Sequence, residues 1–107
     1  MSNPPERPLA ERLLGCWRLL RADGRLDFAP NARMTFLADG YLDYEFDAGM
    51  HRHHRVRMVY RVEDRTLHTE VPEIAHRQSA NFSFGAGDVL IFDFAGQQAM
   101  FVREYQV

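Results

Sequence analysis

The sequence predicts an all-β protein, an eight-stranded antiparallel up-and-down barrel with a short helix at its N-terminal end. Three observations support this fold class. From residue 15 onward, apolar and polar residues alternate with a period of two, as they do in half-buried strands. Turns that contain Gly and Asp recur about every ten residues, and no crossover helix interrupts the series. With 107 residues, of which 46% are hydrophobic, the chain is long enough to bury one core.

The first residues predict an arm and a helix. Residues 1–7 should form an extended arm, and residues 8–107 should form a single domain. Pro8 suits the first position of a helix, Leu9 and Leu13 recur at helical spacing, and Gly15 ends the pattern. We therefore expect a helix over residues 8–14. Its single apolar edge is too small to be stable alone, so it should lie against an open end of the barrel.

The alternating segments define the strands. We expect strands over residues 15–22, 33–36, 41–47, 53–62, 66–71, 78–84, 89–94 and 97–104, with a loop over residues 73–77. In the first strand, Trp17, Leu19 and Arg21 should share one face because side chains on a strand alternate.

Charge pairing predicts the register of the hairpin formed by residues 41–47 and 53–62. If paired residue numbers sum to 100, Glu45 lies opposite Arg55 and Asp43 lies opposite Arg57. Apolar residues then share the other face. The basic stretch is neutralised in this ladder, and the net charge is −2, so we expect no nucleic-acid partner.

A two-residue turn at Glu63 and Asp64 would join the next strand to this hairpin. It would place Arg57 opposite Glu70 and Val56 opposite Val71.

A turn at Ala95-Gly96 predicts the last hairpin, with Leu90 opposite Phe101 inside the barrel. Apolar side chains then also face outward, and a patch of this kind on a barrel surface indicates a partner. We expect a homodimer through these outward residues, which are Val89, Ile91, Met100 and Val102.

Several of these segments resemble the small lipocalin-like proteins of bacteria, which have calycin-type barrels. The resemblance covers residues 9–104 and rests on Gly15-x-Trp17 after a helical turn, the hairpin at residues 37–41, and the closing Phe101-Val102-Arg103. It implies that Trp17 lies at the closed end of the barrel with Arg103 packed across it. An indole face also attracts a guanidinium group on physical grounds alone.

The resemblance further implies a binding function, and the aromatic interior favours a small apolar or aromatic ligand. The alternative is a ligand-free, filled barrel that acts as a structural or interaction domain, because eight strands enclose little more than their own side chains. A cavity of about 300 Å³ or more would favour binding. The expected ligand contacts are Tyr44, Phe46, His54, Met58, Tyr60 and Phe92, with His54 pointing inward opposite Phe46.

The histidines allow a second alternative. His51, His53 and His54 cluster at the tip of one hairpin, and imidazoles are good ligands for transition metals. No cysteine or carboxylate completes a recognisable spacing, so solvated histidines explain the cluster more simply, and we expect no cofactor.

The sequence does not indicate an enzyme. It has no phosphate-binding loop, and none of its serines lies in a nucleophile elbow. His68 and Glu70 could perform acid–base chemistry, but both should face outward. The single cysteine, Cys16, and the absence of a long apolar run favour a cytoplasmic protein without a membrane partner.

Overall fold

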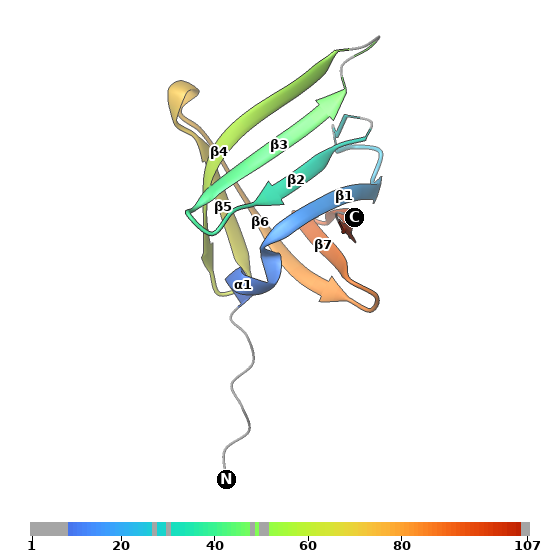
Figure 1. Ribbon diagram of the computed structural model, residues 1–107. Coiled ribbons are helices and arrows are strands. Elements are labelled where there is room, and N and C mark those ends of the chain that lie inside the picture. The colour runs from blue at the N-terminus through green and yellow to red at the C-terminus, as the bar shows by residue number, and fades with distance from the viewer. Residues whose placement is uncertain (1–8, 27, 30, 48, 50–51, 106–107) are drawn as a thin grey trace.

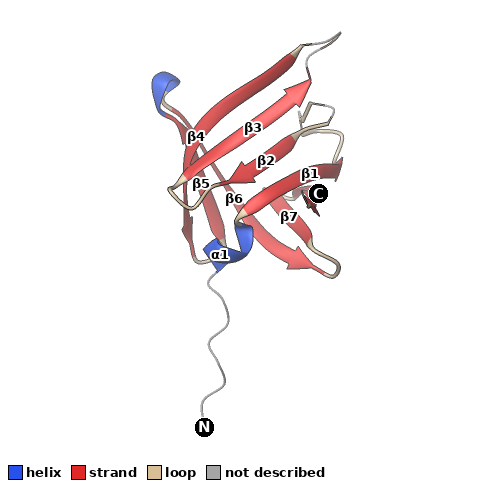
Figure 2. Ribbon diagram, viewed as in Figure 1, coloured by secondary structure: helices blue, strands red, loops and turns tan. Residues whose placement is uncertain are grey.

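The eight strands close into one antiparallel barrel in which each strand pairs with the next and the last pairs with the first (Figures 1 and 2). The computed structural model describes residues 9–26, 28–29, 31–47, 49 and 52–105. The predicted fold class is confirmed. The elements are α1 (Leu9–Leu13), β1 (Gly15–Ala22), β2 (Arg33–Phe36), β3 (Tyr41–Asp47), β4 (His53–Glu63), β5 (Thr66–Val71), the 3-10 turn η1 (Pro72–Ile74), β6 (His76–Gly85), β7 (Val89–Phe94) and β8 (Gln97–Glu104).

Helix α1 lies across one end of the barrel, and η1 and the C-terminal end of β3 lie at the other (Figure 1). The buried side chain of Leu13 anchors the helix to the core, as its single apolar edge predicted. The predicted arm, residues 1–7, lies outside the described residues, as does Pro8. Within the described part of the chain, no helix has the length and apolar character needed to cross a membrane.

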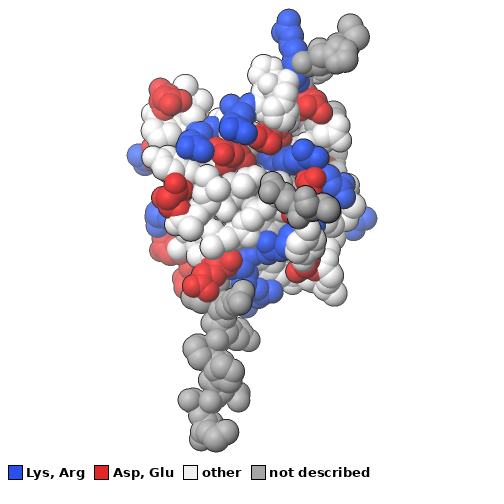
Figure 3. Space-filling view, viewed as in Figure 1, with Lys and Arg blue, Asp and Glu red and all other residues white. Residues whose placement is uncertain are grey.

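The β3–β4 hairpin has the register predicted from its charges. Glu45 lies opposite Arg55, and Asp43 lies opposite Arg57. The Arg57 guanidinium binds both carboxylate oxygens of Asp43, at 2.9 and 3.1 Å. These hydrogen bonds lower the pKa of the Asp43 carboxyl below its ordinary value. Figure 3 shows acidic and basic groups interleaved over these strands, as a neutralised ladder requires.

The predicted register between β4 and β5 is wrong by two residues. The turn residues are Asp64 and Arg65, so Val62 lies opposite Leu67. Asp64 adopts a left-handed φ of 54°, a conformation that Asp tolerates better than most residues. Because the shift is two residues, every side chain keeps its predicted face. Glu70 consequently lies opposite Val59 rather than Arg57.

Strand β6 begins at His76, inside the segment predicted as a loop. Pro72 opens the η1 turn, and Ala75 then takes a left-handed φ of 52°. This tight reversal lets His76 pair with Val71. It also brings Arg77 to Glu70, whose carboxylate accepts a hydrogen bond from the guanidinium at 3.2 Å.

A β-bulge in β1 changes the face of Arg21. The pairing with β8 shifts between Leu19 and Arg21, which leaves Leu20 as an extra, exposed residue. Arg21 therefore faces outward and donates a hydrogen bond to the Met100 sulfur at 3.2 Å. The prediction that Arg21 shares a face with Trp17 is wrong for this reason.

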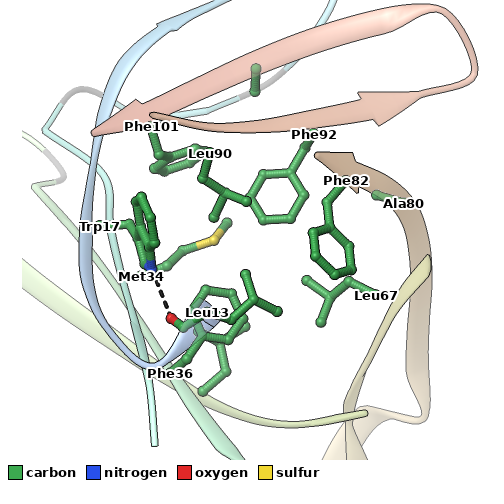
Figure 4. Close-up of a cluster of buried hydrophobic side chains, with 12 residues drawn as sticks. Leu13, Trp17, Met34, Phe36, Leu67, Ala80, Phe82, Leu90, Phe92 and Phe101 are labelled. Carbon is green, nitrogen blue, oxygen red and sulfur yellow. Dashed lines mark hydrogen bonds between the residues drawn. The ribbon is translucent and has the colours of Figure 1, made fainter. Parts of the chain in front are cut away.

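The core lies inside the barrel, between the strands and α1 (Figure 4). Its large side chains pack edge to face, as with Phe92 and Phe101, whose ring centroids lie 5.7 Å apart. The fully buried large side chains are Leu13, Trp17, Phe36, Leu42, Leu90, Phe92 and Phe101.

Candidate ligand cavity

The end of the barrel beneath α1 is closed by Trp17 and Arg103. The indole is fully buried, and its Nε1 donates to the Leu13 carbonyl at 2.8 Å (Figure 4). The Arg103 guanidinium lies over the indole, with its central carbon 4.2 Å from the ring centroid. It also donates to the carbonyls of Leu14 and Arg12, both at 2.7 Å. Arg103 thus satisfies carbonyl groups at the end of α1 that the short helix leaves unpaired.

Gly15 allows this approach. Its φ of +112° lies in the region that favours glycine, and a Cβ there would lie 2.9 Å from the Arg103 Nη1 atom. Glycine at this position therefore has a physical reason in this structure, independent of any resemblance to other proteins.

A cavity of about 280 Å³ lies inside the barrel, on the side of the core away from α1. Its wall is mostly aromatic, thioether and aliphatic, with a few neutral polar side chains from β3, β5 and β6. Two of the lining residues, Gln78 and Ser79, are exposed. The lining residues are Leu26, Phe28, Met34, Leu42, Tyr44, Met58, Leu67, Thr69, Gln78, Ser79, Ala80, Phe92 and Phe94.

The structure places Tyr44, Met58 and Phe92 in this wall, three of the residues predicted to contact a ligand. Tyr60 points elsewhere: its hydroxyl donates to the Leu37 carbonyl at 2.8 Å, and its ring packs on Phe36. Burial raises the pKa of the Tyr60 phenol, so the group remains a neutral donor.

The sequence analysis missed Leu26 and Phe28, which come from the connection between β1 and β2. The Phe28 ring lies 5.6 Å from Phe101, 6.0 Å from Phe94 and 6.4 Å from Tyr44, between centroids. This connection therefore contributes an aromatic wall to the cavity. The only signal in the sequence was the presence of two large apolar residues in a segment with no strand pattern.

Phe46 and His54 lie beyond the cavity, near the tip of the β3–β4 hairpin. They are opposite each other as predicted, with their rings stacked 5.3 Å apart. His54 is nevertheless exposed, and neither it nor Phe46 lines the cavity. The β3–β4 hairpin extends beyond its neighbouring strands here, because β2 pairs with β3 only as far as Glu45 and β5 pairs with β4 only as far as Val59.

His53, a second predicted metal ligand, does not share a site with His54. The His53 Nδ1 atom lies 3.3 Å from the Asp47 carboxylate, on the face of the hairpin opposite to His54. His51 lies outside the described residues. Among the residues that are described, no group of three or more His, Cys, Asp or Glu side chains gathers as a metal site would require. The metal alternative stays a prediction.

The apolar strip on β7 and β8 has the predicted register, with Ile91 opposite Met100 and Val89 opposite Val102. All four side chains are half-buried rather than exposed. The Arg21 side chain covers part of Met100. The homodimer stays a prediction.

A second, polar groove lies on the outer face of β4, β5 and β6. There the His68 Nδ1 atom is 2.7 Å from the Ser79 hydroxyl, and its Nε2 atom is 3.6 Å from the Glu63 carboxylate. Glu70, the partner considered for His68 from the sequence, binds Arg77 instead. His68 and Ser79 are direct cross-strand neighbours, so sheet geometry alone explains their contact.

Comparisons with known proteins bear on the fold. No family model matches the chain, and no curated protein matches it. The crystal structure of a lipocalin-like protein from Bacteroides uniformis matches with a TM-score of 0.69 at 13% identity, covering 87% of this chain and 99% of that one. An uncharacterized protein from Bacteroides eggerthii matches with a TM-score of 0.65 at 11% identity, with the same coverage. At these identities the likeness concerns the fold, and the predicted lipocalin-like barrel is confirmed.

Proposed function

We propose that this protein binds a small apolar or aromatic molecule inside the barrel. The observation that carries the proposal is the cavity of about 280 Å³ with its largely apolar wall. Its volume falls slightly below the lower limit of about 300 Å³ for small-molecule pockets. A filled barrel would leave room for a water or two, each with a share of about 30 Å³ in the liquid. The cavity therefore favours ligand binding over the filled scaffold.

The volume also limits the size of the ligand. A buried apolar cavity of about 150 Å³ takes up benzene. A cavity of about 280 Å³ is nearly twice as large, so it has room for a molecule of about two fused rings. Aromatic walls such as Phe28 and Phe92 suit a flat ligand, because aromatic rings gain from stacked and edge-on contacts.

The test is calorimetric titration of 2-naphthol into the protein and two tryptophan variants. Thr69 lines the cavity, so the indole of Thr69→Trp should occupy the space and weaken binding at least tenfold. Thr66 is on the same strand but on its outer face, which makes Thr66→Trp the matched control that should bind like the wild type. Thermal unfolding of each variant verifies that it is folded.

Two results would count against the proposal. Equal binding by all three proteins would place the compound on the surface. A lack of binding by 2-naphthol, indole and dodecanol alike would leave the cavity without the function proposed for it.

A further inference from the structure

The polar side chains that line the cavity are neutral, and all of them except Tyr44 on β3 lie on the adjacent strands β5 and β6. Among the described residues that line it, there is no Asp, Glu, Arg or His. Thr69 and Gln78 lie opposite each other on β5 and β6, and Gln78 is exposed. The deeper wall, at residues such as Met34 and Phe92, is apolar. A ligand therefore meets a neutral polar rim and an apolar interior.

The Gln78 side chain is the best-placed group to contact a ligand. Its backbone carbonyl accepts a long hydrogen bond of 3.4 Å from the Thr69 hydroxyl. Its side-chain amide makes no hydrogen bond to any other part of the chain that the structure describes. An amide offers both donors and an acceptor, so it can pair with a hydroxyl, a phenol or another amide.

The charged groups near this rim cannot compensate a charge inside the cavity. Glu70 and Arg77 bind each other on the outer face of the same two strands. A carboxylate held against the apolar interior would lose its hydration and gain no cationic partner from the lining. Burial of an uncompensated charge is strongly unfavourable, so an acid would bind only in its protonated form.

We propose that the cavity selects small neutral aromatic molecules with one hydrogen-bonding group, which contacts the Gln78 amide, and excludes carboxylates of the same size. This inference rests on the proposed function, since it specifies the ligand of the same cavity. The fused rings lie against the apolar interior, and the polar group lies at the rim beside Thr69 and Gln78.

The experiment compares 2-naphthol with 2-naphthoate, two compounds with the same rings and a different charge. By calorimetry at neutral pH, naphthoate should bind at least about tenfold more weakly than naphthol. As the pH falls through the pKa of naphthoic acid, the difference should shrink, because the acid becomes neutral. Naphthoate binding within tenfold of naphthol at neutral pH would overturn the inference and leave the proposed function intact. If neither compound binds, the proposed function fails and the inference fails with it.

A second pair of variants tests the polar contact. In Gln78→Leu, the affinity for 2-naphthol should fall about 3- to 10-fold, the usual effect of one lost hydrogen bond. Gln98 is an exposed glutamine on β8, opposite Asp93, so Gln98→Leu is a control that makes the same chemical change away from the cavity. Equal affinities in the two variants would rule out Gln78 as the contact.

Discussion

The contact between Arg103 and Trp17 gives a quantitative test of how the barrel end is held. In the structure, the Arg103 guanidinium makes one contact with the indole face and two hydrogen bonds, to the Leu14 and Arg12 carbonyls. A cation over a partly buried indole contributes about 0.5–2 kcal/mol. Each hydrogen bond from a charged donor contributes about 1.5–3 kcal/mol, and the partial exposure of this site places both bonds at the low end. Arg103→Ala should therefore lower the free energy of unfolding by about 3–5 kcal/mol.

A double-mutant cycle isolates the indole contact. Trp17→Leu removes the aromatic face and also the hydrogen bond to Leu13, and the second loss occurs in both arms of the cycle and cancels. The remaining coupling between Arg103→Ala and Trp17→Leu should be about 0.5–2 kcal/mol, measured by urea unfolding with the m value held constant. Arg12 also lies over an aromatic ring, that of Phe84, at 4.2 Å. Since Arg12 is exposed, Arg12→Ala should cost less than about 1 kcal/mol and serves as the control. Losses that add within about 0.3 kcal/mol would refute the pairing of Arg103 with Trp17.

Three further predictions follow from contacts described above. Gly15→Ala should lower the free energy of unfolding by about 1–3 kcal/mol, because it forces alanine into a positive φ and against Arg103; unchanged thermal stability would contradict this. Asp43→Asn should reduce stability at neutral pH but flatten its acid dependence. Because the pKa of Asp43 is lowered in the folded protein, its contribution to the free energy of unfolding is present above about pH 4, the usual aspartate pKa, and is lost as the pH falls through the folded pKa. Coinciding acid unfolding curves of the wild type and Asp43→Asn would exclude this. Ile91→Glu should convert the expected homodimer to a monomer, and an unchanged mass by light scattering would remove this surface as the interface.

The sequence predicted the registers that charge and turn chemistry determine. In the β3–β4 hairpin, only one alignment pairs Asp43 with Arg57 while keeping Leu42 inside, and the structure has that alignment. The β4–β5 register could not be chosen in the same way. Turns at Glu63-Asp64 and at Asp64-Arg65 differ by two residues in pairing, so both leave the same side chains in the core. The true partner of Glu70 is Arg77, which lay in a segment without a strand pattern.

The cavity was harder to predict than the strands. Alternation identifies inward positions, and Tyr44, Met58 and Phe92 were found in this way. The alternation does not show where along the barrel axis the neighbouring strands end. His54 has the inward parity but lies past the ends of those neighbours, where both faces of the hairpin are solvated. Phe28 was missed because a side chain from a connecting segment has no period, and only closure of the barrel brings it to the cavity.

The seam between β1 and β8 also determines when the protein becomes native during folding. The hydrogen bond from Arg103 to Leu14 joins positions 89 residues apart, whereas the hairpins between them are local. Contacts of such long sequence separation form slowly, because the intervening chain must first be ordered. The native environment of the single tryptophan is complete only when β8 has docked on β1. In a refolding experiment, Trp17 fluorescence will therefore report the closure of the barrel, and circular dichroism will report the earlier formation of its hairpins.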